Sequence, residues 1–380
     1  SHGVGMLPFY VKMLKAELLF PNQEPEMVNT NGSIMMLDGK RGYGQAVGKM
    51  AMEQAIEKCR ETGLVLMTLR NSHHLGRIGT YGEQSIEAGM VSIHFVNVTD
   101  HFPLVAPYRG SDARFSTNPI CLAMPGTKKQ SPVLLDMATS RIALGKARVA
   151  INKSQTLEDG LVVDHKGQPS NNPGVMAGYL YPERENNPPL GALSPLGQYK
   201  GSGLALFCEL FGGVLSGGGT IQPGNIRHDS IINNMFTLLI NPVKLVDIPW
   251  MQHEIEEITS FCKKSPPADP EEPVLIAGDP ERFKEQERKE QCKKLIELHE
   301  IDRLMIPSEI KNNIIKNSNG TKITVVFKWL PKIESDMNKN RITNYINTIL
   351  YNLVVPLPKQ VEEEEEEEEG RGEMKESKKE

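Results

Sequence analysis

Over the first hundred residues, the spacing of hydrophobic and polar positions changes in turn from a helical pattern to an extended one. From 45 to 59 the apolar residues recur at spacings of three and four, which predicts an amphipathic helix. Gly63 is a typical helix end. The apolar runs 64–69 and 91–96 predict two buried strands, with a second helix over 77–88 between them. This β-α-β order is typical of an α/β domain.

Similar patterns continue to about residue 300. The Asn-, Pro- and Gly-rich stretch 151–198 is expected to be mostly loop and turn. Three further apolar runs predict strands at 132–137, 235–240 and 273–278. Four further segments predict helices at 139–148, 200–217, 250–263 and 280–299.

The charge of the chain is concentrated near its C-terminal end. The formal net charge is −5, yet residues 362–380 alone carry eleven Glu against four Lys or Arg. The rest of the chain is therefore close to neutral, which argues against a nucleic-acid-binding surface. Eight consecutive Glu repel one another, so we expect a disordered acidic tail over 362–380.

The cysteines and the lengths of the apolar stretches indicate in which compartment the protein resides. Its five cysteines form no CxxC pair, which supports neither a zinc knuckle nor a disulfide framework and favours a reducing compartment. No stretch reaches the roughly 18 apolar residues of a membrane span, because Glu209 interrupts the most apolar one. We therefore expect a cytoplasmic protein with no membrane partner.

Common nucleotide-binding fingerprints are missing. The stretch from Gly42 to Met50 looks like a P-loop, but five residues instead of four separate its glycines Gly42 and Gly48. Met50 also replaces the hydroxyl that binds magnesium. No GxGxxG follows a predicted strand, so the sequence does not support a Rossmann site.

Polar clusters at the ends of predicted strands or helices are the candidates for chemistry. They are Ser1-His2-Gly3, the loop 70–76 with His73 and His74, the turn 116–119 with Asp136, and 195–203 with Lys200. A histidine exchanges protons near neutral pH, and a helix start beside a lysine receives anionic oxygens. A plain surface loop for the histidines and a solvated Lys200 are the simpler alternatives. A metal site at the histidine pair has no third ligand at helical spacing.

Seven stretches in order resemble the malate/L-lactate dehydrogenase family. They are SHGVGMLPFY (1–10), GQAVGKMAMEQAIEKC (44–59), NSHHLGRIGTYG (71–82), STNPICLAMP (116–125), LLDMATSRIALGK (134–146), PLGQYKGSGLAL (195–206) and VLIAGDPE (274–281). The resemblance implies an α/β, non-Rossmann fold with a mixed sheet and flanking helices. It also implies an NAD- or NADP-dependent oxidoreductase, a 2-hydroxy-acid or 2-oxo-acid substrate, and a homodimer. The expected organisation is an N-terminally truncated oxidoreductase domain over 1–310, an unassigned Asn-, Lys- and Ile-rich extension over 311–361, and the acidic tail.

Site residues follow from the resemblance position by position. His74 matches the family's general acid/base, which takes the hydroxyl proton while hydride leaves C2, and His2 matches a substrate contact and second proton carrier. The positions that match cofactor contacts are Asp136, Met137, Ala138, Lys200, Thr117, Asn118 with Pro119, and Gly278 with Asp279.

One departure from the family motif concerns the substrate carboxylate. Relatives carry Arg four residues after the first histidine, whereas this chain has Met6. Arg70 or Arg77 is then expected to take over the carboxylate. A catalytically impaired relative that acts as a binding or structural dimer is the alternative hypothesis.

Overall fold

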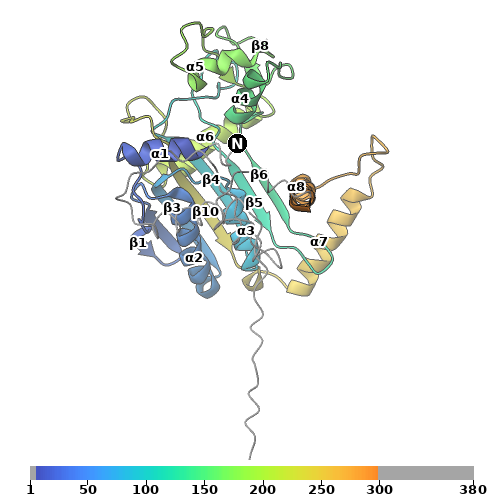
Figure 1. The fold of residues 1–380 in the computed structure, drawn as a ribbon. Helices are drawn as coiled ribbons and strands as arrows, with labels where there is room; N and C mark the ends of the chain where they lie inside the picture. Colours follow the sequence, from blue (N-terminus) through green and yellow to red (C-terminus); the bar gives the residue numbers. More distant parts are fainter. Residues whose placement is uncertain (1–5, 298–380) are drawn as a thin grey trace, which may run out of the picture. The chain divides into compact units, whose positions relative to one another are not determined.

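The structure is a computed structural model that describes residues 6–297, with side chains described up to 290. A mixed sheet of seven strands has the order β1-β2-β3-β10-β4-β5-β6, and a smaller sheet has the order β8-β7-β9 (Figure 1). The strands are β1 (Glu26–Asn31), β2 (Ile34–Asp38), β3 (Leu64–His73), β4 (Val91–Thr99), β5 (Ile120–Met124), β6 (Val133–Met137), β7 (Val162–Val163), β8 (Pro169–Ser170), β9 (Ala192–Leu193) and β10 (Ile232–Ile240).

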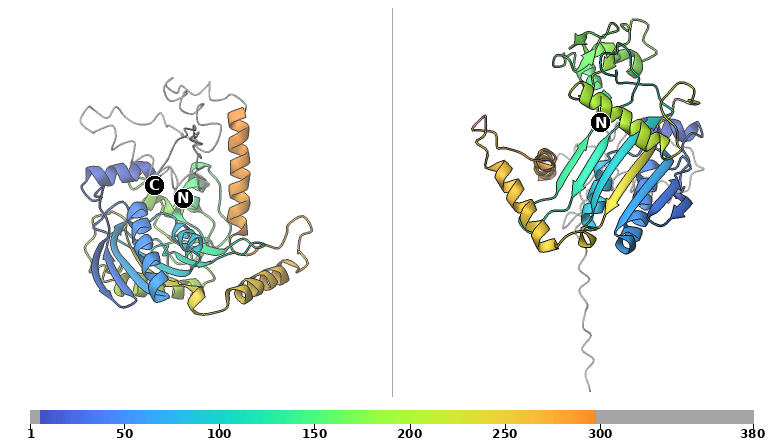
Figure 2. Two further views of the ribbon diagram at one scale, coloured as in Figure 1. Left: turned by 90° about the horizontal axis from the view of Figure 1, so that it is seen from below. Right: turned by 180° about the vertical axis from the view of Figure 1, so that it is seen from behind.

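Helices flank both faces of the large sheet. The α-helices are α1 (Leu7–Lys15), α2 (Gly44–Thr62), α3 (Gly79–Glu87), α4 (Leu144–Asn152), α5 (Ala177–Leu180), α6 (Tyr199–Cys208), α7 (Ile248–Lys263) and α8 (Asp279–Glu297). Two short 3-10 helices, η2 (Pro173–Met176) and η4 (Pro242–Lys244), and a π-helix, η3 (Glu209–Val214), lie between these elements. Figure 1 shows α2 and α3 on one face of the sheet, and the view from behind in Figure 2 shows α6 crossing the other face.

Strand direction defines two edges of the large sheet. β2 and β3 are parallel, whereas β10 lies between β3 and β4 and is antiparallel to both. β5 is antiparallel to β4 and β6, so β2, β3, β4 and β6 all run the same way. We call the edge where these four strands end the carboxyl edge, and the other the opposite edge.

The main core lies between α2 and the sheet. Val47, Ala51, Ala55 and Cys59 recur every four residues along α2 and are completely buried, as the helical periodicity predicts. Gly63 ends α2 with φ +80, a left-handed conformation that favours glycine. The expected α/β fold with a mixed sheet and flanking helices is confirmed.

A second core fills the region around the small sheet, which lies beyond the carboxyl edge in Figure 1. Val162, Leu193, Met176 and Ala147 are completely buried there. The sequence predicted mostly loop over 151–198, and the strands found are only two residues long. The hydrophobic pattern of the sequence did not predict this second core, because the members of the core are spread singly along irregular backbone.

Three predicted elements need correction. No strand forms over 273–278, where the backbone makes a single bond to β6, from the Leu134 amide to the Ala277 carbonyl (3.4 Å). The helix expected from 139 begins at Leu144, because the backbone and hydroxyl of Thr139 both donate to the Thr117 carbonyl instead. The helix expected over 200–217 changes into η3 at Glu209 and ends at Val214.

The expected extension over 311–361 and the acidic tail lie outside the described residues. None of the helices within 6–297 is long and apolar enough to cross a membrane.

Candidate active site

Three of the predicted site segments meet at the carboxyl edge, together with the residues that follow β4. His73 pairs with Ile232 of β10, and Ile232 pairs with Thr99 at the end of β4. On the other side, Ile120 of β5 pairs with Met137 at the end of β6. The segments 73–74, 99–101, 117–119 and 136–138 therefore share one edge of the sheet. His2 lies outside the described residues.

His74 is bound to a tyrosine that the sequence analysis did not single out. The Nδ1 atom of His74 lies 2.6 Å from the hydroxyl of Tyr10 on α1, and the Gln45 amide donates to the same hydroxyl (3.0 Å). Burial raises the pKa of Tyr10 to about 12, although the bond from Gln45 opposes the shift. The phenol therefore keeps its proton at neutral pH and can donate it to Nδ1. This contact fixes the orientation of the imidazole ring.

His73, next in sequence, is in a different state. It is the last residue of β3 and completely buried, not part of a loop as predicted. Its Nε2 atom lies 3.2 Å from the Ser230 hydroxyl. Burial, helped by the positive charge of Arg41, lowers the pKa of His73 to about 4. His73 is therefore neutral at pH 7, which leaves His74 as the candidate proton carrier of the pair.

Asp136 stands at the end of β6 and faces the start of α3. Its Oδ2 atom accepts from the Gly79 amide (2.9 Å) and lies 3.4 Å from Nε of Arg77. Burial raises the pKa of this carboxyl above its ordinary value, and the Gly79 and Arg77 contacts only partly oppose the shift. A partly desolvated carboxylate at a strand end is suited to bind a hydroxyl donor.

The two arginines expected to replace the missing clamp are both engaged. Arg77 also contacts Glu83 (2.7 Å), and Arg70 donates to Asp38 (2.9 Å). Arg41 is a third cation at this edge, and it contacts Asp100 at 2.7 Å. All three guanidinium groups thus have carboxylate partners.

Asn118 is held by Glu209, another residue missed by the sequence analysis. The Asn118 side-chain amide donates to Oε1 of Glu209 (2.8 Å) and to the Ala205 carbonyl (3.1 Å). Glu209 is 3% exposed, and burial raises its pKa. It is the lone charged residue of the apolar stretch 201–219, and that isolation was the available signal. Tyr10 and Gln45 carried no comparable signal.

Lys200 and Gly278 lie in other settings. Lys200 is exposed at the start of α6, in an open cleft that it shares with Arg141, Leu196 and Tyr199. Gly278, with φ +94, begins the turn into α8. That turn is tied to the start of β6, at the opposite edge, by the bond from the Arg282 guanidinium to the Pro132 carbonyl (2.9 Å). The structure does not bring Gly278 together with His74.

Unsatisfied polar atoms also gather at the carboxyl edge. Among the described side chains, four buried atoms have no hydrogen-bond partner: Nε of Arg41, Oε1 of Gln45, Nδ1 of His73 and Oδ1 of Asn118. Buried polar atoms without partners are rare, so four at one edge make it the candidate place for a polar ligand. Within the same part of the chain, no three His, Cys, Asp or Glu side chains are close enough to hold a metal ion.

Comparison with known proteins identifies the class. The family model for malate/L-lactate dehydrogenase matches residues 1–300. This chain belongs to that family, as the seven motifs predicted.

Individual relatives agree with this assignment. Hydroxycarboxylate dehydrogenase B of Escherichia coli K12 is 41% identical over 293 residues, which are 77% of this chain and 78% of that protein. The L-lactate dehydrogenase of Cupriavidus necator is 40% identical over 279 residues, 73% and 77% of the two chains. Among solved structures, sulfolactate dehydrogenase from Methanocaldococcus jannaschii superposes with a TM-score of 0.63 at 31% identity, over 76% of this chain and 79% of that one.

Proposed function

We propose that the protein is an NAD- or NADP-dependent oxidoreductase that interconverts a 2-hydroxy acid and a 2-oxo acid of the malate or lactate type. Similar proteins are named as L-lactate, hydroxycarboxylate and sulfolactate dehydrogenases. The observation that carries the proposal is the bond between His74 and Tyr10, because it orients an imidazole at the edge where unsatisfied polar atoms gather.

His74 is the general acid/base in this proposal. During oxidation it accepts the proton of the substrate hydroxyl, and during reduction it returns that proton to the carbonyl oxygen. The nicotinamide cofactor, when bound, supplies or accepts the hydride at C2. Tyr10 and Gln45 hold the ring so that its other nitrogen faces the substrate. His2 is retained from the family motif as the second proton carrier.

The cofactor fits the polar groups at this edge. Asp136, Met137 and Ala138 at the end of β6, together with Thr117 and Asn118, are the residues that would hold it. The unsatisfied Oδ1 of Asn118 matches a ligand that brings hydrogen-bond donors. Lys200 is retained as a contact for its anionic groups. Gly278 has the least support, since its turn is fixed to the opposite edge.

A second candidate is a catalytically impaired relative that binds the cofactor as a homodimer. Met6 stands where the family has its arginine, and Arg70 and Arg77 are already paired with carboxylates. This arrangement favours weaker binding of the substrate carboxylate.

The two candidates are separated by one set of measurements. NADH and NADPH oxidation is followed by absorbance with oxaloacetate and with pyruvate, and binding of both cofactors is followed by calorimetry. Turnover of either acid supports the dehydrogenase. Cofactor binding without turnover supports the impaired relative, and absence of binding contradicts both. Light scattering tests the homodimer, and fractionation of the source cells tests the cytoplasmic location.

A further inference from the structure

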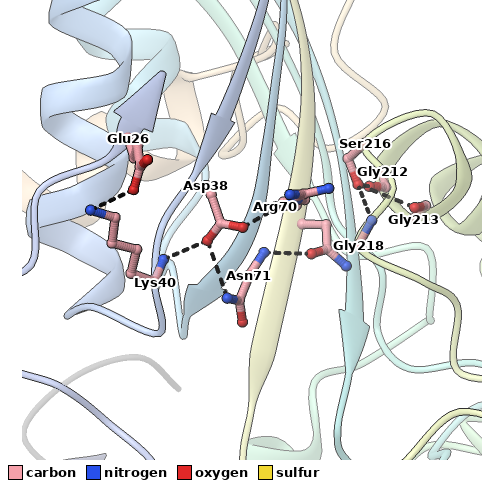
Figure 3. A network of polar contacts seen from close by, with 10 residues as sticks. Glu26, Asp38, Lys40, Arg70, Asn71, Gly212, Gly213, Ser216 and Gly218 are labelled. Atoms are coloured by element: carbon pink, nitrogen blue, oxygen red, sulfur yellow. Dashed lines mark hydrogen bonds and ion pairs between the residues drawn. The ribbon is translucent and has the colours of Figure 1, made fainter. Parts of the chain in front are cut away.

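A series of four asparagines and two carboxylates crosses the large sheet and ends at Asn118. Each member donates to or accepts from its neighbour at 2.8–3.1 Å, from β2 through β3, β10 and β4 to η3. Figure 3 shows its beginning, where Asp38 contacts Asn71. The members, in spatial order, are Asp38, Asn71, Asn234, Asn97, Glu209 and Asn118.

The series fixes which way each amide points. Asn234 accepts from the Asn71 backbone with its oxygen and donates its nitrogen to Oδ1 of Asn97 (3.0 Å). Asn97 in turn donates its nitrogen to Oε2 of Glu209 (3.0 Å). Rotating any one of these amides would place oxygen against oxygen or nitrogen against nitrogen.

Glu209 fixes the orientation of the last amide in the series, that of Asn118. Its Oε2 atom is taken by Asn97 and by the Ile221 amide (3.0 Å), and its Oε1 atom accepts from Asn118. The second acceptor for Asn118 is the Ala205 carbonyl. Both hydrogens of the Asn118 amide are therefore used. The Oδ1 atom of Asn118 therefore makes neither of these contacts. It is completely buried and has no hydrogen-bond partner among the described residues.

We propose that Glu209 is a positioning residue that presents Oδ1 of Asn118 as an acceptor for the carboxamide NH2 of the nicotinamide ring. This inference rests on the proposed function. A 2-oxo acid has no donor besides its acid group, and the hydroxyl of a 2-hydroxy acid is needed at His74. The ribose and adenine of the cofactor also carry donors. However, the reactive ring is the part that must be bound away from water, so it suits an acceptor at a buried position of the carboxyl edge.

The local structure supports a built orientation. Asn118 has φ +35, an unusual value for a residue other than glycine, and its carbonyl lies 3.4 Å from the Cys208 thiol. A Cβ atom at Gly212 would lie 2.9 Å from the Asn97 backbone nitrogen, so η3 approaches β4 as closely as a glycine allows. This approach is what lets Glu209 reach both asparagines.

Exchange of the carboxylate for an amide tests the proposal. In Glu209→Gln, the side-chain oxygen is retained by Asn97 and Ile221, so its NH2 group faces the Asn118 amide. Asn118 can accept from this NH2 group only if it rotates, which breaks its bond to the Ala205 carbonyl and presents nitrogen where Oδ1 was. In the double variant Glu209→Gln with Asn118→Asp, one carboxylate oxygen accepts from the glutamine and the other again faces the ligand.

The measurement is the dissociation constant, by calorimetry, of NAD+ or NADP+ and of its 3-acetylpyridine analogue. The analogue replaces the carboxamide NH2 with a methyl group. The wild type is expected to prefer the natural cofactor by about tenfold, the effect of leaving one buried acceptor unpaired. The preference should fall to about one in Glu209→Gln and return in part in the double variant. Glu256→Gln on α7 is the matched control and should keep the full preference.

Each outcome separates the inference from the proposed function. A preference that survives in Glu209→Gln overturns the inference, because a merely structural role weakens both ligands equally. Equal binding of both ligands by the wild type overturns it as well. Absence of any cofactor binding overturns the proposed function together with the inference. If Glu209→Gln fails to fold by thermal melting, Asn118→Ala removes the same acceptor, and a retained preference there is equally decisive against it.

Discussion

The pKa values of buried carboxylates are shifted in opposite directions at the two edges of the seven-stranded sheet. At the opposite edge, Asp279 accepts from Arg282 (2.6 Å), Lys263 (3.0 Å) and the Ile276 amide (3.1 Å). Burial acts to raise its pKa, but these contacts outweigh burial and hold the pKa below its ordinary value. At the carboxyl edge, burial raises the pKa of Asp136 and of Glu209 despite their partners.

The difference separates groups that stabilise the fold from groups that serve a site. Both carboxylate oxygens of Asp279 are used in contacts that fix the start of α8 to α7 and to the turn before α8. The carboxyl edge instead keeps raised pKa values and four unsatisfied polar atoms, which cost stability unless a ligand completes them. The following predictions test this contrast, from the largest expected effect to the smallest.

Removing the imidazole at the carboxyl edge should have the largest effect. His74→Ala is expected to lower kcat by roughly 10²-fold or more, because it deletes the general acid/base. Steady-state kinetics with the best substrate measure this effect. His253→Gln is the control, since His253 is an exposed histidine on α7 and is not assigned to the site. If both variants lost activity equally, the assignment to His74 would be wrong.

Asp279→Asn should reduce stability without affecting the site. Loss of the charge between Lys263 and Arg282 is expected to lower the free energy of unfolding by about 2 kcal/mol at pH 7. Because the folded-state pKa of Asp279 is lowered, its contribution is complete above the unfolded value of about 3.9 and is lost as the pH falls through the folded value. Urea unfolding of both proteins at pH 7 and at lower pH should show the two curves converge. Cofactor affinity should stay the same.

The same substitution at the carboxyl edge should do the reverse. Asp136→Asn is expected to weaken cofactor binding by about tenfold, since a charged acceptor is lost. Its free energy of unfolding should change by less than about 1 kcal/mol, because burial already disfavours the charge. Calorimetry and urea unfolding give the two numbers. An unchanged affinity would remove Asp136 from the cofactor site.

Tyr10→Phe is expected to have the smallest effect. It removes one hydrogen bond to His74 but leaves the ring packing, so kcat should fall about fivefold with little change in KM. The control is Tyr43→Phe, since the Tyr43 ring packs against Tyr10 (5.3 Å between centroids) without a role in the proposed proton transfer. A wild-type kcat in Tyr10→Phe would show that the phenol does not orient His74.

Sequence patterns predicted the elements that are regular and long. The four-residue apolar repeat of α2 and the glycine that follows it specify a helix end on local grounds. The strand predicted at 273–278 failed because a short apolar run between Pro273 and Gly278 has the same pattern whether or not it pairs with a neighbouring strand. Its backbone found one bond to β6 and no ladder.

The sequence predicted many of the residues of the candidate site, but it did not predict the contacts that these residues make. The motifs pointed to His74, Asp136 and Asn118, whose segments the sheet brings to one edge. Their partners Tyr10 and Glu209 lie 64 and 91 residues away from His74 and Asn118. Such contacts depend on tertiary packing, which local periodicity does not encode. The role of Lys200, in its open cleft, stays a prediction.

The glycines of η3 have a consequence for how this protein can vary. A Cβ atom at Gly213 would lie 2.5 Å from the Gly219 carbonyl oxygen and 2.6 Å from the side-chain Nδ2 atom of Asn97, and Gly212 is restricted by the backbone of Asn97 and Asn234. Backbone atoms cannot move aside as a flexible side chain can. In a library with every substitution at every position, these two sites should therefore accept glycine and almost nothing else, although neither has a side chain with which to touch a ligand.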